Sequence, residues 1–154
     1  MEENRIHLKD LLPVVKETLA SGGEFLIYPQ GVSMLPYLRE GQDRVVLSPF
    51  SDVARKGDIL LYERRDGTLV LHRVVRVEKD GTLSMRGDNQ YFIERGIAPT
   101  QVIAIVKRFY RGEKEVCVNA LPSRLYRARR ALFYPFRRYS RAIARRIGLC
   151  KRGK

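Results

Sequence analysis

The sequence is poor in the residues that build metal sites and disulfide frameworks. Its 154 residues include only two cysteines, Cys117 and Cys150, and two histidines, His7 and His72. Two cysteines fit neither a zinc cluster nor a disulfide scaffold, and a zinc ion would need carboxylate ligands in addition. We therefore expect no metal and no cofactor.

Long hydrophobic runs are also missing. No stretch approaches the ~18–20 consecutive apolar residues that a transmembrane helix needs. Residues 1–10 are of mixed charge and lack the hydrophobic segment of a secretory signal. With 44% hydrophobic residues the chain can still bury a core, and its length suits one domain. The sequence thus predicts a globular protein in the cytoplasm.

Acidic residues are absent from the last part of the chain. Residues 1–119 carry 18 Lys and Arg against 17 Asp and Glu, a net charge of +1. Residues 120–154, the basic tail, carry 12 Lys and Arg and no acidic residue, so they hold most of the total charge of +13. Any argument from charge to a partner therefore concerns the basic tail.

The chain begins with one segment of helical periodicity. Apolar residues recur at intervals of three or four between Ile6 and Ser21. Pro13 favours a helix start near Leu12, because proline is tolerated best in the first turn. Gly22 favours an end to the helix. We predict one N-terminal helix within residues 1–23.

The periodicity then changes to that of short strands, separated by Gly, Pro and Asp turns. The predicted strands are residues 24–28, 43–47, 58–63, 69–78, 82–86, 101–110 and 115–118. Asp66-Gly67 and Asp80-Gly81 are typical of hairpin turns. The pattern predicts a mostly β domain, barrel-like or sandwich-like, over residues 24–119.

The basic tail has helical periodicity as well. From Leu121 to Leu149 the apolar residues fall on one stripe, arginines fill the other faces, and Pro135 should separate two helices. A basic amphipathic helix with aromatic residues is typical of an anionic membrane surface, and we expect attachment to the inner face of the membrane. Two alternatives stay open: binding of nucleic acid, and a solvated tail that packs on its own body.

Three residues in the body have side chains suited to hydrolytic chemistry. Ser33 follows a short strand in Gly-Val-Ser-Met-Leu-Pro, where a constrained backbone can expose a nucleophile. His72 lies in an apolar strand, and alternation places it on the face opposite Arg73. Asp88 lies in a Gly-Asp-Asn turn. Taken singly, each also has an ordinary structural explanation as a turn or strand residue.

Taken together, these motifs resemble the signal peptidase I superfamily, which also includes the self-cleaving LexA-like repressors. The motifs that carry the resemblance are Gly31–Leu38, Gly57-Asp58, His72–Val75 and Gly87–Asn89. His72 stands where many members have a lysine. A histidine at this place resembles the endoplasmic-reticulum and archaeal branch of the superfamily. The resemblance implies a mostly β peptidase fold with a strand-lined groove. Because we see neither a transmembrane anchor nor a DNA-binding domain, the chain resembles a soluble, stand-alone member.

The resemblance also implies a Ser-His-Asp mechanism. Ser33 Oγ would attack a peptide carbonyl, His72 would accept and return the proton, and Asp88 would orient the imidazole. The Ser33 N–H would be one oxyanion donor, and the Val32 N–H is a candidate for the second.

Neighbouring residues complete the predicted substrate site. Gly31 and Met34 belong to the same oxyanion and substrate-binding loop as Val32, and residues 28–32 would pair with an extended substrate. We therefore expect a serine endopeptidase that cleaves a leader, signal or precursor peptide at the membrane surface. Two other classes stay open: a catalytically inactive peptide- or membrane-binding module of the same fold, and a nucleic-acid-binding regulator.

Overall fold

A computed structural model of the chain describes residues 8–118, 120 and 125–126. The chain divides between Asn119 and Ala120 into two units, and the following elements belong to the first. They are α1 (Leu12–Ala20), β1 (Phe25–Ile27), β2 (Asp43–Ser48), β3 (Ile59–Glu63), β4 (Leu69–Val77), β5 (Leu83–Arg86), β6 (Glu94–Ile97), the 3-10 helix η1 (Pro99–Gln101), β7 (Val102–Arg111) and β8 (Lys114–Cys117). The predicted tail helices, the stripe over 121–149 and Cys150 lie outside the described residues, apart from Leu125 and Tyr126.

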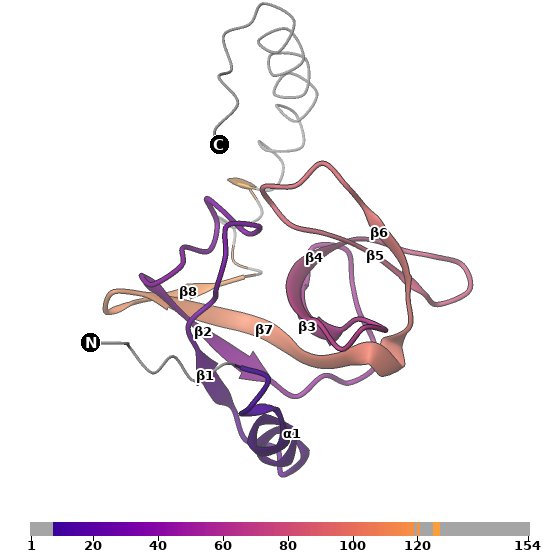
Figure 1. The fold of residues 1–154 in the computed structure, drawn as a ribbon. Helices are drawn as coiled ribbons and strands as arrows, with labels where there is room; N and C mark the ends of the chain where they lie inside the picture. The colour runs from indigo at the N-terminus through magenta and orange to yellow at the C-terminus, as the bar shows by residue number, and fades with distance from the viewer. Residues whose placement is uncertain (1–7, 119, 121–124, 127–154) are drawn as a thin grey trace, which may run out of the picture. The chain divides into compact units, whose positions relative to one another are not determined.

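The strands form one antiparallel sheet, which confirms the predicted mostly β fold. The order is β1-β2-β7-β3-β4-β5-β6, and β8 pairs with β7. β1 and β6 stand at the ends of this order and do not pair with each other within the described residues, so the sheet is open. Figure 1 shows the long strand β7 crossing the sheet, where it pairs with β2 at one end and β3 at the other.

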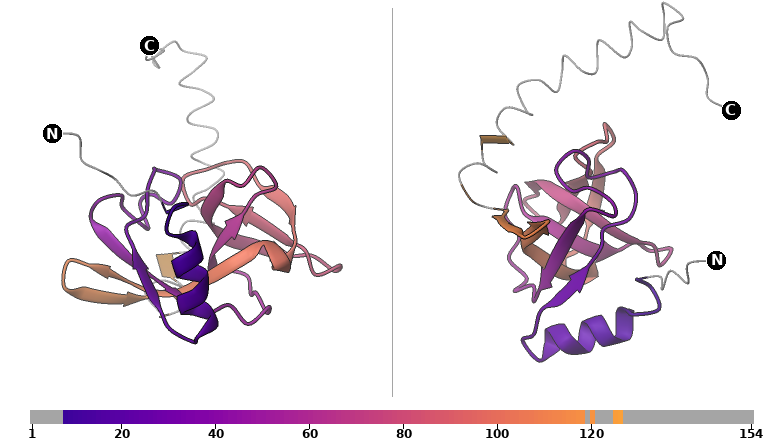
Figure 2. Two further views of the ribbon diagram at one scale, coloured as in Figure 1. Left: turned by 60° about the horizontal axis from the view of Figure 1, so that its bottom comes forward. Right: turned by 90° about the vertical axis from the view of Figure 1, so that its left-hand side faces the viewer.

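The helix α1 begins at Leu12 and has Pro13 in its first turn, as the sequence predicts. Residues 8–11 form turns instead of a helical segment. Val15 and Leu19 are buried. Figure 2 shows in both views that α1 lies beside β1. No helix in the described part of the chain is long and apolar enough to cross a membrane.

Strand β6 is the one strand that the sequence did not predict. Its residues, Glu-Arg-Gly-Ile, lack the alternating apolar pattern of a half-buried strand. It forms because β5 offers a free edge, with Leu83 opposite Ile97 and Met85 opposite Glu94. Tertiary pairing therefore outweighs a weak local preference.

The core lies around β3, which is flanked by β7 and β4. All residues of Ile59–Tyr62 are buried. One buried cluster consists of Leu60, Tyr62, Val74, Leu83, Met85 and Ile97. Within this cluster Tyr62 carries a hydroxyl group, which needs a hydrogen-bond partner.

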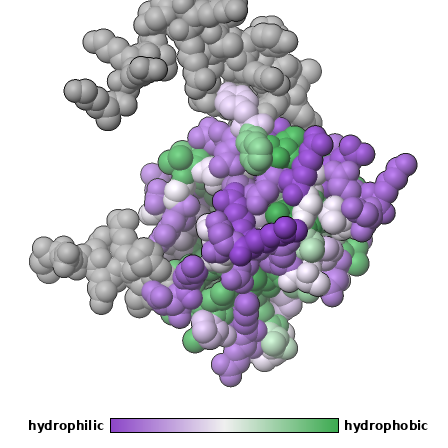
Figure 3. Space-filling view, turned by 45° about the vertical axis from the view of Figure 1, so that its right-hand side comes forward, coloured by the Kyte–Doolittle hydropathy of each residue, from purple (hydrophilic) through white to green (hydrophobic). Residues whose placement is uncertain are grey.

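On the outside, Figure 3 shows one face where hydrophobic side chains form separate patches among hydrophilic ones.

Candidate active site

Ser33 lies in the loop between β1 and β2, and the Gly-Asp-Asn turn holds its backbone. The Asn89 N–H donates to the Ser33 carbonyl oxygen at 2.7 Å, and Asn89 Nδ2 donates to the Val32 carbonyl oxygen at 3.2 Å. A Cβ added to Gly87 would lie 2.6 Å from the Ser33 carbonyl oxygen, closer than real Cβ contacts come. Glycine at 87 therefore permits the close approach of the two loops.

Ser33 and His72 line one cavity of about 640 Å³. Its walls come from the segment before α1, from β1 and the loop after it, and from the start of β4. The lining residues include Leu8, Leu11, Leu26, Tyr28, Gly31, Met34, Leu38, Leu61, Arg64, Val70, Leu71 and Gln90. No hydrogen bond joins Ser33 Oγ to His72 in the part of the chain that the structure describes.

His72 is buried on β4, with 3% of its surface exposed. It lies opposite Leu60 of β3 in the ladder. Its Nδ1 is 3.3 Å from the hydroxyl oxygen of Tyr62, and the planes of the two rings make an angle of 58°. Burial and the nearby Arg64 charge lower the pKa of His72 to about 4. The imidazole is therefore neutral at pH 7, as a general base must be.

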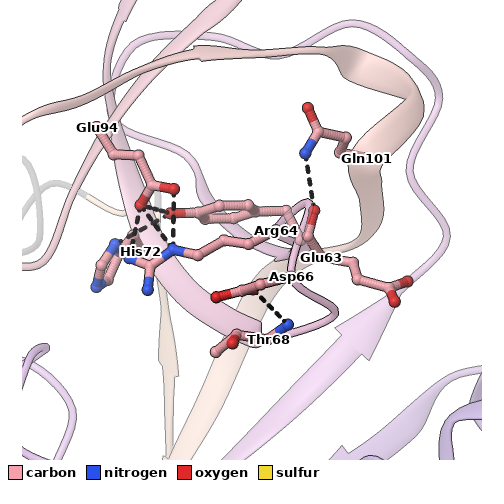
Figure 4. A network of polar contacts seen from close by, with 8 residues as sticks. Glu63, Arg64, Asp66, Thr68, His72, Glu94 and Gln101 are labelled. Carbon is pink, nitrogen blue, oxygen red and sulfur yellow. Dashed lines mark hydrogen bonds and ion pairs between the residues drawn. The ribbon is translucent and has the colours of Figure 1, made fainter.

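The Tyr62 hydroxyl continues to a carboxylate. It donates to Glu94 Oε2 at 2.8 Å. Arg64 holds that carboxylate with two donors, Nε at 2.9 Å from Oε1 and Nη2 at 2.7 Å from Oε2. Burial would raise the pKa of Glu94, but the hydrogen bonds from Arg64 and Tyr62 outweigh it and lower the value. Figure 4 shows Glu94 beside Arg64 and His72.

Asp88 is bound to Arg73 and not to His72. Arg73 Nε and Nη2 donate to the two carboxylate oxygens of Asp88 at 2.9 and 2.8 Å, and both side chains are 7% exposed. Successive strand residues point to opposite faces, so the Arg73 side chain leaves β4 on the face opposite His72. Asp88 acts on the imidazole only through its charge, which raises the pKa of His72 against the larger effect of burial. The structure therefore differs from the expectation that Asp88 orients the imidazole.

The remaining predicted residues have separate positions. Gly31 is exposed with φ of 79°, a conformation that favours glycine, and it lines the cavity. Met34 is buried and also lines the cavity. Val32 is exposed, and its carbonyl accepts the Asn89 bond. Residues 28–32 lie beyond the end of β1 at Ile27, so they are not part of a strand.

Sequence reasoning did not find Tyr62, Arg64 and Glu94. The one available signal was the hairpin turn at Asp66-Gly67, which sets the register of β3 against β4. In that register Tyr62 lies opposite Val70, two residues from His72 on the same face. Glu94 could not be found this way, because it lies on β6, the unpredicted strand.

Among the described residues no cluster of His, Cys, Asp and Glu could hold a metal ion. Comparison of the chain with family models, with curated proteins and with solved structures finds no match. The chemistry of the site is therefore argued from its own geometry.

Proposed function

We propose that the protein is a serine endopeptidase of the signal-peptidase kind that cleaves leader, signal or precursor peptides. The observation that carries the proposal is the cavity shared by Ser33 and the neutral, buried His72. The motif resemblance described above supports the same assignment. Ser33 is the nucleophile and His72 the general base.

The reaction follows from these two side chains. His72 takes the hydroxyl proton as Ser33 Oγ attacks the peptide carbonyl, and it returns the proton to the leaving amine. Water then hydrolyses the acyl-enzyme by the same steps. Clamping of the Ser33 carbonyl oxygen by the Asn89 N–H fixes the loop that presents Oγ and the Ser33 N–H, our candidate oxyanion donor.

The cavity suits an extended peptide. β1 stands at the end of the sheet order, and residues 69–72 of β4 pair only with β3 among the described strands, since pairing with β5 begins at Arg73. Both bordering strands thus have a free edge that a substrate backbone can bond. Apolar lining residues such as Leu26 and Leu71 favour apolar side chains of the substrate.

Ser33→Ala tests the proposal. The full chain is incubated with a proteome-derived peptide library, and mass spectrometry identifies the new termini. The wild type should produce a defined set of termini and react with a fluorophosphonate probe, whereas Ser33→Ala should do neither. The matched control is Ser51→Ala, at an exposed serine after β2, which should behave as wild type. A wild type that neither cleaves nor labels would instead support a peptide-binding module without turnover.

We further propose that the basic tail attaches the peptidase to an anionic membrane surface on the cytoplasmic side. The support is its charge of +12 and its apolar stripe. The full chain should float with anionic vesicles and not with zwitterionic ones, and deletion of residues 120–154 should abolish flotation. Salt-dependent retention on DNA without vesicle binding would instead favour the nucleic-acid regulator.

A further inference from the structure

We propose that Tyr62 is a positioning residue that selects the tautomer of His72, with the proton on Nδ1 and a free lone pair on Nε2. The consequence for catalysis rests on the proposed function, since Nε2 is then the atom that accepts the Ser33 proton. The tautomer itself follows from the hydrogen bonds alone.

His72, Tyr62 and Glu94 form a series of hydrogen bonds, in which the number of available protons decides which group donates. Glu94, bound by two donors of Arg64, is a carboxylate and can only accept. The single hydroxyl proton of Tyr62 is directed to Glu94 at 2.8 Å. Only the oxygen lone pairs of Tyr62 then remain for the Nδ1 atom 3.3 Å away. Nδ1 must therefore carry a hydrogen, and because the buried imidazole is neutral at pH 7, Nε2 then carries none.

The opposite tautomer is unfavourable for the same reason. A bare Nδ1 would face the lone pairs of the Tyr62 oxygen with no proton between them. If Tyr62 turned its proton to Nδ1, the Glu94 carboxylate would lose one of its donors. Tyr62 is fully buried, so water cannot replace either missing bond at low cost.

The hydrogen bonds from His72 through Tyr62 to Glu94 also distinguish this site from a triad in which a carboxylate binds the imidazole directly. The Tyr62 hydroxyl separates the Glu94 charge from the ring, and Arg64 compensates that charge. The tautomer is thus fixed by a neutral group. In a directly paired triad the carboxylate both orients the imidazole and stabilises its charged form. In this site orientation comes from Tyr62, and the charge stabilisation by Glu94 acts at longer range.

The test is ¹⁵N NMR of the histidine side chains in the full chain at pH 7. The sequence has only two histidines, so a His7→Gln variant assigns the signals of His72. In the wild type we expect a proton-bearing Nδ1 and a bare Nε2. In Tyr62→Phe the ring packs as before but offers no acceptor, and the proton should move to Nε2. In Glu94→Ala the freed Tyr62 proton should turn to Nδ1 and drive the same change.

The matched control is Tyr110→Phe, which removes another tyrosine-to-glutamate hydrogen bond, to Glu115 at the surface, and should leave the His72 signals unchanged. In the peptidase assay Tyr62→Phe should lower kcat by about 10- to 100-fold and leave KM unchanged. A wild-type Nε2–H, or an Nδ1–H that persists in both variants, would overturn the inference. If the chain proves not to cleave peptides, the NMR result still decides the tautomer, so the two failures are distinguishable.

Discussion

Arg73 and Asp88 form a buried, bidentate ion pair that links β4 to the Gly-Asp-Asn turn. Arg73 also donates to the Gly57 carbonyl oxygen at 2.9 Å and lies over the Tyr37 ring, 4.5 Å from its centre. Asn89, next to Asp88, holds the Ser33 carbonyl oxygen. The pair therefore supports the loop that contains Ser33, and its Arg73 side chain leaves β4 on the face opposite His72.

Asp88→Ala should destabilise the fold strongly. It leaves the Arg73 guanidinium buried without its carboxylate, which typically costs about 3–5 kcal/mol in the free energy of unfolding. Urea denaturation measures this. The control is Asp10→Ala, at an exposed aspartate before α1, which should leave stability near wild type. A stability of Asp88→Ala close to that of the wild type would show that Arg73 does not depend on the pair.

Gly87→Ala should strongly reduce the proposed peptidase activity and only slightly reduce the stability of the fold. The added methyl group meets the Ser33 carbonyl oxygen at 2.6 Å, so the loop must shift. A displacement of about 1 Å at a nucleophile can cost ~100-fold in rate. The control is Gly81→Ala, where the new Cβ meets no atom within 4 Å but φ is +83°. This variant should lose about 1 kcal/mol of stability and keep the wild-type activity. Equal activity losses in the two variants would contradict the close-approach argument.

The proposed peptidase activity should persist in mild acid. His72 must be neutral to accept the Ser33 proton, and burial lowers its pKa to about 4. The acidic limb of kcat/KM against pH, which reports the free enzyme, should therefore have its midpoint near pH 4. A midpoint near the ordinary value of ~6.5 would mean that His72 is not the base or is not buried in solution.

Removing the Arg64 charge should move that limb toward neutral pH. Next to burial, the positive charge of Arg64 lowers the pKa of His72, whereas the negative charge of Glu94 raises it. Arg64→Met removes the positive charge and leaves the Glu94 charge uncompensated, so the pKa of His72 should rise. NMR titration of His72 and the pH profile should shift upward together. Arg65→Met, at the exposed neighbour, is the control and should shift neither. A downward shift in Arg64→Met would contradict the assigned electrostatics.

Folding stability should fall on the acid side because of the same histidine. Its pKa is lowered in the folded state relative to ~6.5 in the unfolded chain. The stabilisation from the neutral buried ring is thus complete above pH ~6.5 and is lost as the pH falls toward 4, on the order of 2–3 kcal/mol. Urea denaturation between pH 7 and pH 4 should show a shallower loss for His72→Gln than for the wild type. Parallel pH dependences would exclude His72 as the cause.

Local features of the sequence predicted most of the fold. The start of α1 follows from Pro13, and the two Asp-Gly turns lead to the β3–β4 and β4–β5 hairpins. These features depend on backbone preferences within a few residues, so no distant contact is needed to see them. β6 escaped because its pairing depends on the edge of β5 and not on its own composition.

By itself, the sequence determined the mostly β class, the concentration of charge in the basic tail, and the motifs that contain Ser33, His72 and Asp88. Only the tertiary structure decided which groups lie together: Ser33 and His72 line one cavity, Asp88 pairs with Arg73, and Tyr62 links the imidazole to Glu94. The physical reason is that hydrogen-bond partners are chosen by strand register and by the face on which a side chain lies. A shift of one residue in the register of a strand would move each of its side chains to the other face and so change its partners.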